Sequence, residues 1–239
     1  TVDSLIVGNF LGSSALAAVS SSGSLIFMLI GFLSGISAGA GVIVARFFGA
    51  GDEKNLQRAV HTTVAFGLVA GVLMTGVGVA LSPQILRWMD TPESVMRESV
   101  TYLQIYFAGS LGFVMYNVLV GILQAVGDSR HPLYYLIVSS VINLVLDLLF
   151  ITGFHTGVGG AAVATVISQI VSALLCFWQL LRTKESYGLK IRKIRFDKGI
   201  LVQIIKIGLP SGVQNSIIAF ANVIVQSNIN AFGEMAMAG

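Results

Sequence analysis

The sequence predicts an all-α protein that crosses a membrane several times. Two observations carry this prediction: charged residues make up only 10% of the 239 residues, and hydrophobic residues make up 55%. A soluble domain has about 25% charged residues and uses them to cover its surface. Lipid is therefore expected to surround most of this chain.

The individual spans follow from the lengths of the apolar runs. A helix needs about 20 apolar residues to cross the hydrocarbon core, because each residue adds about 1.5 Å. Residues 2–8 are expected to end a first helix, and Gly208 and Pro210 are expected to interrupt the last one. Complete or nearly complete runs lie at 23–45, 60–81, 100–124, 133–152, 158–181 and 201–232. Since the chain begins at Thr1 and ends within an apolar stretch, we expect a fragment of a longer protein.

The basic residues predict how the spans are oriented. Only Arg87 and Arg97 lie in loops on one side, whereas the other 12 of the 14 Lys and Arg residues lie on the opposite side. Loops rich in Lys and Arg stay in the cytoplasm. The predicted cytoplasmic set is Arg46, Lys54, Arg58, Arg130, Arg182, Lys184, Lys190, Arg192, Lys193, Arg195, Lys198 and Lys206.

One long polar segment divides the chain. Residues 1–181 are expected to form a first transmembrane lobe, 182–200 a basic cytoplasmic linker, and 201–239 the start of a second lobe. A lipid-binding role for the basic linker is the alternative, because clustered Lys and Arg attract anionic headgroups. A shift of 221 residues aligns Asn9 with Asn230 and Gly12 with Gly233, which favours two parallel repeats.

Two acidic residues lie within predicted spans. These two are Asp3 and Asp147. The other nine of the 11 acidic residues lie in loops or at helix ends. A carboxylate in a spanning helix costs at least about 2.5–3.5 kcal/mol, so such residues are candidates for a functional site.

Two neutral residues are expected at a depth in the membrane similar to that of the two acids. Counted from the expected helix ends, Asp3, Asp147 and Thr165 each lie about 8–9 Å below the outer surface. Asn143 lies one turn beneath Asp147 on the same helix face. Oxygen ligands of this kind suit Na⁺, and paired carboxylates suit a shared proton. In the alternative interpretation, Asp3 caps a helix, and Asn143 and Asp147 only join helices.

Three motifs resemble the multidrug and toxic compound extrusion (MATE) family. They are VDSLIVG at 2–8 with the following LGSSALAAV, ARFFGAGD at 45–52, and NLVLDLLFITGFHTGVGGAAVAT at 143–165. The resemblance extends over the whole chain. It implies one six-helix lobe of a twelve-helix transporter plus the start of the second lobe, and a cation site at Asp3, Asn143, Asp147 and Thr165. The seventh helix, which carries a functional acid in some members, offers only amides and hydroxyls here.

The resemblance implies an antiporter in a bacterial cytoplasmic membrane that exports amphipathic, cationic drugs in exchange for H⁺ or Na⁺. Such a protein is not an enzyme and needs no cofactor beyond the coupling ion. Its expected partners are the lipid bilayer and small drug-like substrates, without nucleic acid, and it is expected to be a monomer when complete. The alternative is a flippase for lipid-linked saccharides, which should place several Arg or Lys residues in its cavity. A membrane enzyme would need a cluster of catalytic side chains that the sequence does not offer.

Overall fold

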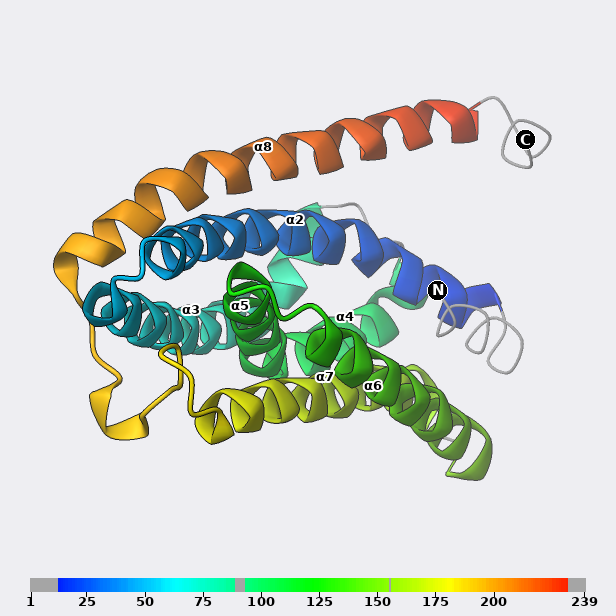
Figure 1. Ribbon diagram of the computed structural model, residues 1–239. Coiled ribbons are helices and arrows are strands. Elements are labelled where there is room, and N and C mark those ends of the chain that lie inside the picture. The colour runs from blue at the N-terminus through cyan, green and yellow to red at the C-terminus, as the bar shows by residue number, and fades with distance from the viewer. Residues whose placement is uncertain (1–12, 89–92, 155, 232–239) are drawn as a thin grey trace.

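The computed structural model describes residues 13–88, 93–154 and 156–231, and these residues form a bundle of long helices (Figure 1). The part of the chain that is described contains no strand. In chain order the elements are α2 (Ser13–Gly49), α3 (Glu53–Trp88), α4 (Glu93–Ala108), α5 (Ser110–Ala125), α6 (Arg130–Leu148), the π-helical turn η1 (Leu149–Gly153), α7 (Gly157–Arg182), the short 3₁₀ helix η2 (Ile191–Lys193) and α8 (Lys198–Ala231).

The helices have the lengths and the surface of membrane spans. Four segments are long and apolar enough to cross a bilayer: Ile30–Gly49, Glu53–Trp88, Arg130–Gly153 and Gly157–Arg182. Their outward faces carry large apolar side chains, such as Val72 and Leu73 of α3, which are 60% and 61% exposed. Lipid is the solvent that tolerates such faces, so the all-α membrane fold is confirmed.

The span predicted at 100–124 is not one straight helix. The chain breaks at Gly109, and the segments Met96–Ala108 and Ser110–Ala125 are bent by 47° relative to each other. Val166 of α7 packs directly against the hydrogen of Gly109, where any Cβ would collide with it. The predicted span is therefore a bent pair of helices, and the bend depends on a neighbour far away in the sequence.

The last helix is also different from its prediction. Gly208 and Pro210 do not interrupt α8, which continues through both residues. Gly208 instead lets two backbones approach: a Cβ on it would lie 2.9 Å from the Cα of Ile36 in α2. Figure 1 shows α8 running beside α2, so the start of the expected second lobe packs on the first through small residues.

The linker between α7 and α8 is held against the first turns of α3. His61 is buried and its Nε2 accepts the backbone N–H of Lys190 at 3.1 Å. Thr62 Oγ1 accepts the N–H of Asp197 at 3.1 Å, and the Asp197 carboxylate pairs with Arg58 at 2.5 Å. Gln57 donates to the carbonyl oxygens of Ser186 and Gly188. Two turns of α3 thus fix the path of a segment about 130 residues further along the chain.

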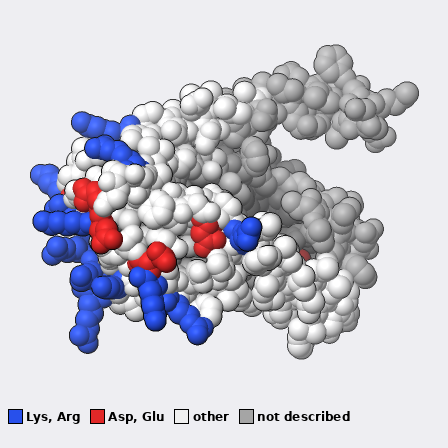
Figure 2. Space-filling model, viewed as in Figure 1, with Lys and Arg blue, Asp and Glu red and all other residues white. Residues whose placement is uncertain are grey.

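Most of the Lys and Arg side chains of the described residues gather at one end of the bundle. Figure 2 shows Lys and Arg side chains concentrated where α2 turns into α3 and where the linker leads into α8. These are the residues that the sequence assigns to a single side of the membrane.

Candidate functional site in the α6–α7 helix pair

Helix α6 turns a polar face inward and an apolar face outward. Its buried residues are Pro132, Ser139 and Asp147. Successive spacings of seven and eight residues place them on one face, because two helical turns take about seven residues. Its outward face carries exposed apolar side chains, among them Leu133, Ile137, Val141, Leu144 and Val145. The side chains that could do chemistry therefore face the neighbouring helices rather than lipid.

Asp147 is completely buried, with a relative exposure of 0%. It is the one charged residue among the buried polar residues that the structure describes; the others are Ser, Thr and His61. An ionised carboxylate is costly to bury in a low-dielectric interior unless a counterion, a proton or hydrogen bonds compensate its charge. The charge of Asp147 therefore depends on whether a proton, a cation or hydrogen-bond donors lie next to it.

A hydrogen bond sets the register between α6 and α7. Ser139 Oγ donates to the carbonyl oxygen of Ser168 at 2.9 Å, and both residues are buried. The two helices run in opposite directions on either side of a short turn. Four residues further along α6, Asn143 therefore lies near the level of Thr165, and Asp147 lies about one turn closer to the predicted outer end.

The common level that the sequence predicts for Asp147 and Thr165 stays a prediction. Counted from the Ser139–Ser168 hydrogen bond, Thr165 lies near the level of Asn143. Thr165 is half-buried and its hydroxyl donates to the carbonyl of Ala161 at 3.0 Å. Nδ2 of Asn143 is buried, and no described residue accepts a hydrogen bond from it. Carboxylate, amide and hydroxyl groups from two helices thus occupy neighbouring turns, a donor set that fits a proton or Na⁺.

The fourth candidate, Asp3, lies outside the described residues. Its predicted pairing with Asp147 therefore stays a prediction.

The turn that follows Asp147 is a feature that sequence reasoning missed. Residues Leu149–Gly153 form a π-helical turn, and π turns are frequent next to functional sites. Thr156 Oγ1 donates to the carbonyl of Phe150 at 2.8 Å, and Gly157 adopts a positive φ of 64° to start α7. Gly160 leaves no room for a Cβ beside Thr156. The glycine and threonine residues at 152–160 are the only sequence signal of this packing.

A small apolar cluster lies next to the site. A buried cluster joins Tyr102 of α4, Ile151 of η1 and Val158, Ala161 and Ala162 of α7. This cluster lies in the same turns of η1 and α7 that flank Asp147 in the register above.

The described residues thus form a bundle of membrane-length helices with a fully buried carboxylate on α6. The MatE family model matches residues 1–149, and the chain belongs to this family. The chain is 34% identical to the "Probable multidrug resistance protein YoeA" of Bacillus subtilis (strain 168), over 99% of this chain and 53% of that protein. It is 31% identical to the "Probable multidrug resistance protein YpnP" of the same strain, over 100% of this chain and 53% of that protein.

Solved structures agree with this assignment. A crystal structure described as MATE in the bent conformation superposes with a TM-score of 0.89 at 28% identity, over 99% of this chain and 53% of that one. The chain therefore spans about half the length of the relatives it matches. The family resemblance read from the sequence is confirmed.

Proposed function

We propose that the complete protein exports small amphipathic, cationic drugs in exchange for H⁺ or Na⁺, and that this chain supplies its first lobe and the start of its second. The observation that carries the proposal is the burial of Asp147 between membrane-spanning helices. The names of YoeA and YpnP as probable multidrug resistance proteins support the choice of cargo.

The proposed mechanism follows from the charge of Asp147. Binding of a proton or Na⁺ neutralises the carboxylate and favours closer packing of the helices around it. Release of the cation restores the charge and favours a looser, more hydrated packing. A ligand shifts such an equilibrium only through its different affinity for the two states. Drug and cation alternate if each favours a different packing of the two lobes.

The flippase alternative has less support. The buried polar and charged residues in the described part of the chain include no Lys or Arg, which a cavity for anionic saccharide lipids would need. We also propose that the protein lies in a bacterial cytoplasmic membrane. The 182–200 linker is then cytoplasmic, because that end of the bundle carries most of the basic residues.

The proposal is tested by expressing the complete gene in a host that lacks its own drug exporters. We expect lower accumulation of a lipophilic cationic dye than in cells with empty vector, and a higher inhibitory concentration of cationic drugs. Collapse of the membrane ion gradients should remove the difference. Residues 1–239 alone should export no dye, because the second lobe is incomplete; strong export by this chain alone would contradict the two-lobe mechanism.

A further inference from the structure

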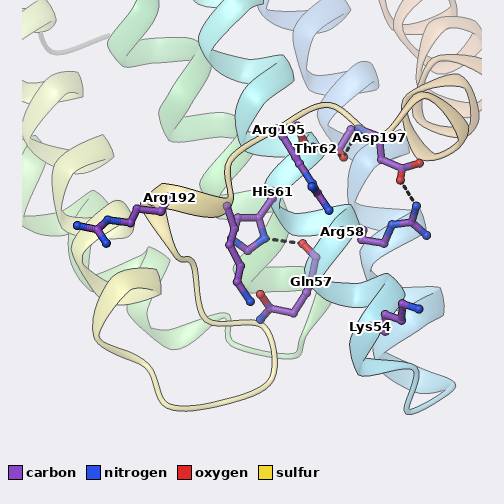
Figure 3. A pocket seen from close by; sticks show the side chains of 9 residues that line it. Lys54, Gln57, Arg58, His61, Thr62, Arg192, Arg195 and Asp197 are labelled. Atoms are coloured by element: carbon purple, nitrogen blue, oxygen red, sulfur yellow. Dashed lines mark hydrogen bonds and ion pairs between the residues drawn. The ribbon is translucent and has the colours of Figure 1, made fainter.

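A basic cavity lies between the first turns of α3 and the docked linker (Figure 3). It has a volume of about 570 Å³. Its lining includes five basic residues and one acidic residue: Lys54, Arg58, Arg192, Lys193, Arg195 and Asp197. The carboxylate of Asp197 pairs with Arg58. No carboxylate of the described residues lies within ion-pair distance of the other four cations, so the cavity has an excess of positive charge.

The walls of this cavity are held in place. His61 and Thr62 bind the linker backbone at Lys190, Arg195 and Asp197. Figure 3 shows Arg195 reaching between His61 and Arg58, whereas Lys54 lies beyond Arg58, one turn earlier on α3, and Arg192 points away. Arg195 and Lys54 both line the cavity. Both kinds of side chain bind phosphate, because Arg offers two parallel N–H donors and Lys adds a point charge.

The surroundings of the cavity point to a phosphate at a membrane surface. The linker exposes two large apolar side chains beside the cavity, Ile191 at 60% and Phe196 at 48%. Basic residues interleaved with exposed apolar ones are typical of segments that lie at the headgroup level of an anionic leaflet.

We propose that this cavity binds the phosphate headgroup of an anionic phospholipid. Lys54 and Arg195 contact the phosphate, and Ile191 and Phe196 insert beside it into the interface. The site is independent of the proposed drug export, because it uses none of the residues near Asp147. A lipid bound here bridges α3 and the linker, and so joins the first lobe to the helix that starts the second.

The test is a binding titration with the purified complete protein in neutral detergent. The probe is a fluorescent phosphatidylglycerol, with fluorescent phosphatidylcholine as the neutral comparison. The variant Lys54→Gln/Arg195→Gln removes two charges from the cavity. The matched control Lys184→Gln/Lys206→Gln removes two exposed charges from the same end of the protein and leaves the cavity intact. Because all four side chains are exposed, these changes should leave the fold intact, which size-exclusion chromatography verifies.

We expect the wild type to prefer phosphatidylglycerol by at least about tenfold. Each basic residue near an anionic surface contributes about fivefold in affinity, so the cavity variant should lose about 10- to 30-fold. The control should change by less than about twofold. Equal losses in both variants would overturn the site in favour of diffuse attraction. Inorganic phosphate at millimolar concentration should not displace the lipid probe; displacement would identify a site for free phosphate and overturn the lipid assignment. The charge-reversed pair Lys54→Glu/Arg195→Glu should abolish the preference, and a retained preference would also overturn the proposal.

Discussion

Gly212 of α8 lies directly against Phe32 of α2: a Cβ on Gly212 would stand 2.8 Å from the carbonyl oxygen of Phe32. One turn earlier, Gly208 makes the same kind of approach to Ile36. These contacts join the first lobe to the helix that begins the second. The contact is made between backbones, so it depends on the absence of side chains rather than on particular ones.

The variant Gly212→Ala is therefore expected to destabilise the complete protein by about 1–3 kcal/mol, because the new methyl group overpacks the contact. The matched control is Gly76→Ala in α3, where a Cβ would meet nothing within 4 Å. At that exposed helical position, alanine should be neutral or stabilising by up to about 1 kcal/mol. Thermal unfolding in detergent measures both. Equal shifts in the two variants would contradict a specific contact between α2 and α8.

The hydrogen bonds that hold the linker predict how fast a protease cleaves it. His61→Ala removes a buried hydrogen-bond partner of Lys190, a loss of about 1–3 kcal/mol in local stability. We expect trypsin to cleave the linker about tenfold faster, because its basic residues become accessible by local unfolding. His131→Ala is the control, since the His131 side chain is 45% exposed and pairs with Asp128 in a different loop. If both variants are cleaved at the wild-type rate, the linker is not held by His61.

The concentration of basic residues at one end predicts the topology. A reporter fused at Lys190 should give a cytoplasmic signal, and one fused at His155 an extracytoplasmic signal. Cysteine labelling with a membrane-impermeant reagent at the same two positions is an independent measurement. Reversed labels would contradict the orientation and, with it, the assignment of an outer end to the site.

The spans and the buried acid were predictable because they depend on local composition. A long apolar run lies in lipid whichever helices it packs against. Asp147 stands out as a charge inside such a run. The break at Gly109 was not predictable, because Gly112 and Gly121 lie in the same apolar stretch without breaking their helix. What distinguishes Gly109 is Val166, a residue of another helix.

The relative depth of Asp147 and Thr165 depends on the geometry of the turn between their helices. The estimate assumed α-helical geometry up to the loop and a start of the next helix near Gly159. The structure has a π-helical turn after Leu148 and starts α7 at Gly157, so the residue count from each end changes. The contacts between α3 and the linker were also out of reach, because they join residues about 130 positions apart that no sequence period relates.

The predicted partnership of Asp3 with Asp147 is tested by a double variant. Asp3→Asn and Asp147→Asn should each abolish cation-driven efflux by the complete protein, if the two carboxylates act as one unit. The double variant should then lose little more than either single one, because residues that share one function are not additive. Efflux from loaded vesicles measures all three. Additive, partial losses would show two separate roles.

The most direct test of the account is drug efflux by Asp147→Asn in vesicles with an imposed proton or Na⁺ gradient. Asparagine keeps the shape and removes a buried charge, so the variant should fold with unchanged or higher thermal stability. The same substitution at Asp128, which lies between α5 and α6 and pairs with His131, is the control and should transport like the wild type. We predict that gradient-driven efflux by Asp147→Asn falls to the level of protein-free vesicles. Transport at the wild-type rate would contradict the account and leave Asp147 with a structural role only.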